Sequence, residues 1–201
     1  MRSHPRRRHV VPEKLDYDLA RLRIRDGDVL LYRGRSLQSR IIQWVTGSPY
    51  SHAGLAVWWN ARLMVLEAVG KGVIVTTLSS NVRHYRGDVE WYTSKKDLPD
   101  ADRHKLVSIA QRELGKEYAL WKAIVLGLRL LLKRGIERRD TLRKERKLFC
   151  SLYVAAVYNG VGMDLKEGVS DSFTSPNDIA LSPLLKRVAT LKRHMISQNS
   201  A

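Results

Sequence analysis

The sequence has little cysteine, because Cys150 is the only one among 201 residues. A single thiol excludes an internal disulfide, and there is no paired Cys and His spacing of the kind that binds zinc. A Gly-rich phosphate-binding fingerprint is also absent. We therefore expect no cofactor and no metal, and the remaining question is whether Cys150 is a buried core residue or a nucleophile.

Long apolar runs are absent as well. The longest apolar segment, residues 119–133, is shorter than the roughly 20 apolar residues of a membrane-spanning helix, and charged residues interrupt it. The basic start, MRSHPRRRHVVPEK, contains no apolar run, so it does not resemble a secretory signal. We expect a cytoplasmic or peripheral membrane location, with release to a cell wall by lysis if the protein is derived from a phage.

Acidic residues are outnumbered, since 36 Lys and Arg against 20 Asp and Glu give a formal net charge of +16. Such a field attracts anionic partners. Within residues 119–133, Lys122, Arg129 and Lys133 fall on one stripe of a predicted helix. This stripe is either the solvated edge of a core helix or a face that lies on an anionic membrane. No zinc-finger, helix-turn-helix or base-stacking motif is present, so we expect no specific nucleic-acid partner.

The length fits one domain, which we expect over residues 21–188, between a basic, weakly ordered lead-in (1–20) and a tail (189–201). Short apolar runs bounded by Gly, Asn and Ser predict a strand within 25–34 and then an antiparallel meander. The runs of the meander are residues 51–59, 62–69, 72–78 and 88–94. Helices are predicted after Ser36, over 100–114, at Cys150 and from Pro176. Strands grouped before helices indicate the α+β class.

His52 and Glu67 are the polar residues that stand out in the predicted strands. Alternation places His52 on one side with Gly54 and Ala56, which leaves space for another element to approach the imidazole. Glu67 lies among apolar residues, and a carboxylate buried there without a partner is costly. We expect Glu67 to orient His52 from a neighbouring antiparallel strand and to stabilise its protonated form.

Cys150 stands where a helix begins, between a basic run and residues that are apolar on nearly every side. A thiol at a helix N-terminus and beside an imidazolium is favoured as a thiolate. Thiolate, imidazolium and carboxylate together are the components of covalent acyl transfer. Taken singly, each residue has an ordinary explanation, as a core thiol, a structural histidine or a strand-edge acid. The combination favours a nucleophile.

The order of three motifs then carries a resemblance to a known family. His52 in SPYSHAGLAV, Glu67 in VLEAV and Cys150 in LFCSLYVAAVY resemble the circularly permuted NlpC-type papain-fold enzymes, in particular the YaeF/YiiX-like permuted amidases. The segments GDVLLYRG, LGKEYAL and SPNDIALSP support the resemblance, which runs from about Gly27 to Leu185. It implies a permuted papain-like catalytic domain in which the cysteine helix packs on a small antiparallel sheet or barrel.

The resemblance also implies roles for individual residues. Cys150 matches the nucleophile, His52 the general base and Glu67 the third, polar member of a catalytic triad. The backbone N–H of Cys150 is expected to hold the oxyanion, and Tyr32 and Ser51 are candidates for an additional side-chain contact.

Three functions remain open from the sequence. The leading one is a cysteine hydrolase that cleaves an amide or related acyl bond through an acyl-enzyme, with peptide or peptidoglycan-type substrates implied by the resemblance. An alternative is a lipid acyl hydrolase or acyltransferase with the same triad, as in the lecithin:retinol acyltransferase-like branch of the superfamily. The second alternative is a non-catalytic basic module that binds an anionic polymer or membrane.

Overall fold

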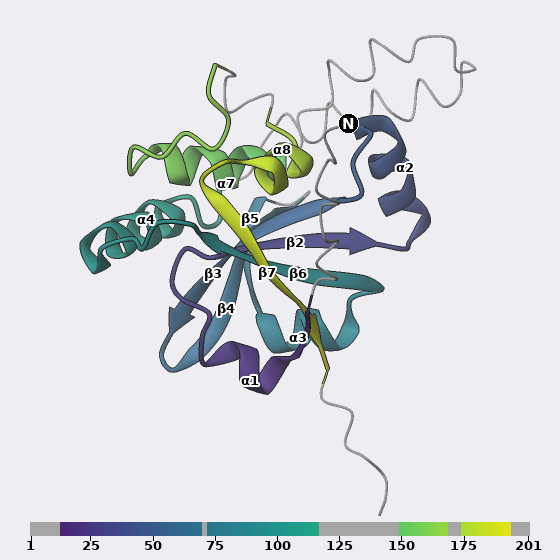
Figure 1. Ribbon diagram of the computed structural model, residues 1–201, viewed down its shortest axis with the longest axis horizontal. Coiled ribbons are helices and arrows are strands. Elements are labelled where there is room, and N and C mark those ends of the chain that lie inside the picture. The colour runs from purple at the N-terminus through teal and green to yellow at the C-terminus, as the bar shows by residue number, and fades with distance from the viewer. Residues whose placement is uncertain (1–12, 70–71, 117–148, 169–173, 194–201) are drawn as a thin grey trace, which may run out of the picture.

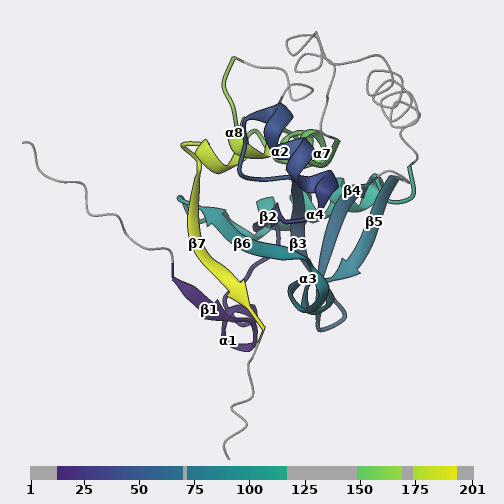
Figure 2. The same ribbon diagram turned by 90° about the vertical axis from the view of Figure 1, so that its right-hand side faces the viewer.

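The computed structural model describes residues 13–69, 72–116, 149–168 and 174–193. Over these residues the chain forms a seven-stranded sheet with helices on both of its faces (Figures 1 and 2). The strand order is β1-β7-β6-β2-β3-β4-β5, and every pair is antiparallel except β1 and β7, which are parallel. The predicted α+β class is confirmed.

The strands and helices agree with most of the predicted elements. The strands are β1 (Lys14–Asp16), β2 (Val29–Gly34), β3 (His52–Trp59), β4 (Arg62–Val69), β5 (Gly72–Thr77), β6 (Gly87–Ser94) and β7 (Leu185–Lys192). The helices are α1 (Tyr17–Arg21), α2 (Leu37–Thr46), α3 (Leu78–His84), α4 (Asp100–Arg112), α7 (Phe149–Asn159) and α8 (Pro176–Leu181).

Local chemistry explains where several helices begin and end. The Ser36 side chain accepts the Ser39 N–H at the start of α2, and Gly47 ends that helix in the left-handed region with φ of 62°. At the start of α8, Ser175 and Asp178 form a reciprocal capping box with Pro at the first helical position. The predicted caps of both helices are confirmed.

The predicted four-strand meander is only partly correct. Strands β3, β4 and β5 do form consecutive antiparallel pairs, but β6 pairs with β2 and β7 instead of β5. The difference arises from α3, a helix that was not predicted and that Thr77 caps by accepting the Ser80 N–H. This helix carries the chain across the sheet (Figure 1).

Three other sequence expectations concern the ends and the basic segment. The expected lead-in contains β1 and the start of α1, and β7 extends into the expected tail. The segment 119–133, with Lys122, Arg129 and Lys133, lies outside the described residues. Of the helices that are described, none has the length and apolar character needed to cross a membrane.

The sheet separates two hydrophobic cores. One core, which includes Leu55, Leu66 and Val154, lies between the sheet and helices α4, α7 and α8. The other, which includes Val65 and Leu78, lies on the face covered by α1 and α3. Because side chains alternate along a strand, β3 and β4 contribute to both cores.

Candidate active site

His52 and Glu67 contact each other across strands β3 and β4. The distance from His52 Nε2 to Glu67 Oε2 is 2.5 Å, and the side chains are 21% and 9% exposed. Gly54 follows two residues after His52 on β3, and a Cβ added there would come within 2.7 Å of Val65 Cγ1 and 3.4 Å of Glu67 Cβ. The predicted contact is therefore present, and the small residue at position 54 leaves room for it.

The second oxygen of Glu67 is held by two residues that the sequence did not single out. Thr76 Oγ1 donates to Glu67 Oε1 at 2.7 Å, and Asn81 Nδ2 lies 3.5 Å from the same oxygen. Thr76 belongs to β5, which pairs with β4, so strand alternation could have indicated it. Asn81 lies on α3, a helix that was not predicted, and its position had no sequence signal.

Cys150 lies in the first turn of α7 and is 5% exposed. The charge and side chain of Cys150 raise the pKa of His52, so the thiol lies close to the imidazole. The structure thus brings together all three residues that the sequence analysis proposed for the triad.

Helix α7 is anchored firmly around the thiol. Ser151 Oγ donates to the Thr174 carbonyl at 2.5 Å, and Tyr153 Oη donates to the Ala110 carbonyl at 3.0 Å. Tyr158 Oη, further along the helix, donates to the carbonyl of Gly27 at 2.6 Å. These buried hydroxyl contacts fix the helix to two segments that precede it in the sequence and to one that follows it. The thiol therefore has a defined position relative to His52.

The charges of the three groups support one another. Burial alone would lower the pKa of His52, but the charge and hydrogen bond of Cys150, followed by those of Glu67, raise it to about 10. Burial would raise the pKa of Glu67, whereas the hydrogen bond and charge of His52, with Thr76 and Asn81, lower it below its usual value. The arrangement therefore favours an imidazolium beside an ionised carboxylate at neutral pH.

The two oxyanion candidates make contacts within the protein. Tyr32 is buried, its ring centroid lies 5.2 Å from that of His52, and its hydroxyl accepts a hydrogen bond from Asn81 at 2.8 Å. Ser51 Oγ accepts the Gly34 N–H at 3.2 Å and donates to the Tyr32 carbonyl at 3.3 Å. Both residues support the strand ends next to His52.

Tyr85 is a further polar residue near the thiol that the sequence analysis missed. Its hydroxyl lies 3.3 Å from Ser51 Oγ and also hydrogen-bonds to Ser39 on α2. Burial chiefly raises its pKa, and the charges of Cys150 and Glu67 contribute in the same direction. The hydroxyl of Tyr85 is therefore protonated at neutral pH and close enough to Cys150 to sense its charge.

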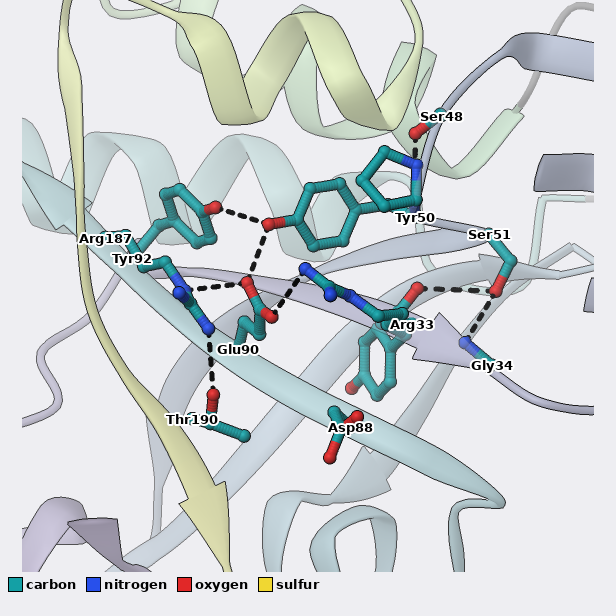
Figure 3. A network of polar contacts seen from close by, with 12 residues as sticks. Arg33, Gly34, Ser48, Tyr50, Ser51, Asp88, Glu90, Tyr92, Arg187 and Thr190 are labelled. Carbon is teal, nitrogen blue, oxygen red and sulfur yellow. Dashed lines mark hydrogen bonds and ion pairs between the residues drawn. The ribbon is translucent and has the colours of Figure 1, made fainter. Parts of the chain in front are cut away.

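A second polar network lies beside the segment that leads into His52 (Figure 3). Glu90, 2% exposed, contacts Arg33 Nη2 at 3.1 Å and Arg187 Nε at 2.8 Å. Tyr50 Oη donates to Glu90 Oε2 at 2.6 Å and lies 2.7 Å from Tyr92 Oη. This Glu90 network fixes Tyr50, two residues before His52, to strands β2, β6 and β7.

Comparison with known proteins finds one family that is similar to the first part of the chain. The family described as "Permuted papain-like amidase enzyme, YaeF/YiiX, C92 family" matches residues 23–122, which include His52 and Glu67. Over these residues the chain is similar to this family. The matched region ends before Cys150, so the family match itself does not include the thiol.

Two relatives give the extent of the likeness. The uncharacterized protein YiiX of Escherichia coli strain K12 is 37% identical over 95 residues, which are 46% of this chain and 46% of that protein. The matched region therefore spans about half of the length of that relative. The crystal structure of metalloprotein yiiX from Escherichia coli O157:H7 is similar with a TM-score of 0.60 and 25% identity, over 83% of this chain and 97% of that one. The permuted papain-like fold is thus confirmed.

Proposed function

We propose that the protein is a cysteine hydrolase that cleaves an amide or related acyl bond through an acyl-enzyme on Cys150. In this proposal His52 is the general base and Glu67 orients it. The observation that carries the proposal is that the imidazole of His52 contacts the carboxylate of Glu67 and is also influenced by the side chain of Cys150. The same order of groups activates the nucleophile in other thiol hydrolases.

The proposed reaction has two steps. The Cys150 thiolate attacks the substrate carbonyl, and the imidazolium of His52 gives its proton to the leaving amine as the C–N bond breaks. Neutral His52 then takes a proton from water, whose oxygen attacks the thioester and releases a carboxylic acid and the thiolate. The backbone N–H of Cys150 would stabilise the oxyanion, and Tyr85 joins Tyr32 and Ser51 as a candidate for a second donor.

The family description favours amides, so peptide and peptidoglycan-type amides are the proposed substrate class. The similar crystal structure, that of YiiX, is described as a metalloprotein. In the part of this chain that the structure describes, no group of three or more His, Cys, Asp and Glu is placed to hold a metal ion. The donor set found here does not fit a metal, and the proposed steps use none.

Acylation of Cys150 by 4-nitrophenyl acetate, followed by intact mass, tests the proposal with a generic acyl donor, so the natural substrate need not be identified first. Because the chain has one thiol, the urea-unfolded protein at the same pH is a reference for an unactivated cysteine. We expect the folded protein to acquire one acetyl group faster than this reference and then to lose it by hydrolysis. Acylation no faster than in the unfolded chain would contradict the proposal.

Cys150→Ser is the matched control, because it removes the thiol with a minimal change in shape. It should give no adduct, and turnover should fall by at least about 10³-fold. Thermal unfolding of the variant shows that a loss of adduct does not come from unfolding. Turnover that survives in folded Cys150→Ser would exclude Cys150 as the nucleophile.

A further inference from the structure

Helix α2 presents its apolar stripe to solvent. Leu37, Ile41 and Trp44 are spaced i, i+4 and i+7, so they lie on one face of the helix. Leu37 is 76% exposed and Trp44 is 50% exposed, while Ile41 is partly exposed. None of the described side chains of α2 is fully buried. A surface helix of a globular protein normally turns such a stripe toward the core.

The polar face of α2 makes the contacts with the rest of the domain. Gln43 Nε2 donates to the carbonyls of Gly34 and Pro49, at 2.9 and 3.0 Å. Ser39 packs so closely on Gly34 that an added Cβ would come within 2.1 Å of Ser39 Oγ. Hydrogen bonding and close packing on this polar side therefore fix the orientation of the helix, and the apolar stripe is left facing outward.

The charged residues of α2 and of the segments that flank it in sequence are all basic. From Arg33 to Ser51 the sequence contains three arginines and no acidic residue, and the first of these arginines pairs with Glu90. Arg40 is exposed on α2 next to the stripe, and Arg35, just before the helix, is 71% exposed although it pairs with Asp88. An apolar stripe bordered by arginines matches an anionic lipid surface, where the apolar side chains enter the acyl boundary and the guanidinium groups meet the phosphates.

The helix also adjoins the candidate active site. Its Ser39 hydrogen-bonds to Tyr85, whose hydroxyl senses the charge of Cys150, and its polar face contacts the ends of β2 and the segment before His52. Helix α1, in which Leu19 is exposed, lies at the opposite end of the molecule in both views (Figures 1 and 2). A surface that bound α2 would face the end of the domain that holds the thiol.

We propose that the outward face of α2, formed by Leu37, Ile41, Trp44 and Arg40, docks the protein on anionic lipid membranes. The docking stands independently of any reaction at Cys150. It differs from the basic stripe expected over residues 119–133, because it is formed by other residues and combines charge with exposed apolar side chains.

Vesicle flotation tests this proposal with phosphatidylcholine vesicles that contain phosphatidylglycerol, compared with pure phosphatidylcholine. Wild type should float with the anionic vesicles and bind less as salt is raised. Leu37→Glu should weaken binding about tenfold or more, because one large apolar side chain no longer leaves water. Arg40→Gln should weaken it roughly fivefold. Both positions are exposed, so thermal unfolding should be nearly unchanged.

Leu22→Glu is the matched control, since Leu22 is 79% exposed and is the C-cap residue of α1, a helix at the other end of the molecule from α2 (Figure 1). It should leave vesicle binding within twofold of wild type. Equal loss in Leu22→Glu and Leu37→Glu, or binding that survives Leu37→Glu, would overturn the proposal. A dimer that Leu37→Glu dissociates, in a protein that does not bind vesicles, would assign the stripe to a second copy instead.

A spin label gives a second, structural readout. Cys150→Ser provides a background without cysteine, in which Leu37→Cys can carry a nitroxide. On anionic vesicles this label should become accessible to oxygen and protected from a water-soluble nickel complex, whereas a label at Leu22→Cys should not change. A label on α2 that remains in water while the protein is bound would refute docking by this face.

Discussion

Two buried carboxylates on the same sheet, Glu67 on β4 and Glu90 on β6, have very different surroundings. Glu67 contacts one imidazole, and a hydroxyl and an amide approach its other oxygen. Glu90 contacts two guanidinium groups and accepts a hydrogen bond from one phenol. Both are less than 10% exposed. Arginine remains charged at any accessible pH, whereas histidine gains and loses its proton near neutrality.

This difference indicates a catalytic role for Glu67 and a structural role for Glu90. A carboxylate held by arginines has a permanent charge balance and can only stabilise the fold. A carboxylate that contacts a histidine lying beside a thiol influences the protonation of that histidine. The two glutamates therefore provide a matched pair in which the same substitution should have opposite consequences.

Glu67→Gln should have the largest effect of the substitutions, and this effect should be on the rate of Cys150 acylation. A glutamine can still hydrogen-bond to His52 and Thr76, but it cannot balance the imidazolium charge. We expect acetyl transfer from 4-nitrophenyl acetate to Cys150 to slow by about 10²–10⁴-fold, with a loss of about 1–2 kcal/mol in unfolding free energy. Intact mass against time gives the rate, and urea denaturation gives the stability. An unchanged rate in this variant would remove Glu67 from the proposed triad.

Glu90→Gln should reverse the pattern. Two arginines lose their counter-charge, so the free energy of unfolding should fall by about 2–3 kcal/mol. Acylation of the folded protein should stay within a few-fold of wild type, because the Glu90 network reaches His52 only through Tyr50. A rate loss as large as that of Glu67→Gln, measured where both variants are folded, would contradict this separation.

The pH dependence of the free energy of unfolding should also distinguish the two carboxylates, although the expected differences are smaller than those in the two preceding predictions. The raised pKa of His52 means that its stabilisation is complete below about pH 6.5, the unfolded value, and is lost as pH rises toward about 10. The lowered pKa of Glu67 means that its stabilisation is present above about pH 4.3 and is lost in stronger acid. Wild type should therefore lose stability from about pH 6.5 to about pH 10 in urea denaturation.

Glu90→Gln should retain this alkaline decline, whereas Glu67→Gln should shift it to lower pH because the His52 pKa is no longer raised by the carboxylate. Parallel curves for wild type and Glu67→Gln would show that the His52–Glu67 pair does not contribute to stability through its charge.

Thr76→Val should have the smallest effect. It removes the hydroxyl that donates to Glu67 with little change in shape, so unfolding free energy should fall by about 1 kcal/mol and acylation by a few-fold. Thr93→Val is the control, since Thr93 donates to the buried carboxylate of Asp28 at 2.8 Å. It should cost similar stability without a change in acylation rate. Equal rates in the two variants would limit Thr76 to a structural role.

Strand alternation and apolar patterning were sufficient to predict the contact between His52 and Glu67. These signals are local, and a small residue at position 54 marked the side on which a neighbour approaches. The start of the Cys150 helix was equally visible, because its residues are apolar on nearly every side. No local pattern joins the thiol and the imidazole, which are far apart in the sequence, so their pairing was predicted from the chemistry of the combination and from the resemblance.

Long-range pairing accounts for what the sequence did not predict. Strand β7 (LKRVATLK) mixes basic and apolar residues, and the register shifts opposite Trp91 and Tyr92, so its alternation is incomplete. Helix α3 has few apolar positions, so the sequence did not predict it. The positions of Asn81 on this helix and of Tyr85 at its C-cap were therefore not predicted either. The period of α2 identifies its stripe, but only the contacts of Ser39 and Gln43 show that the stripe points outward.

The position of β7 has a consequence for protein synthesis. This late strand lies between β6 and β1, so the first strand of the described sheet has no neighbour until β7 has left the ribosome. A translation product that stopped before residue 185 would expose the edge of β6 and would leave Glu90 without Arg187. Such a fragment would present an open strand edge and an unbalanced charge to chaperones and proteases, although it would already contain Cys150, His52 and Glu67.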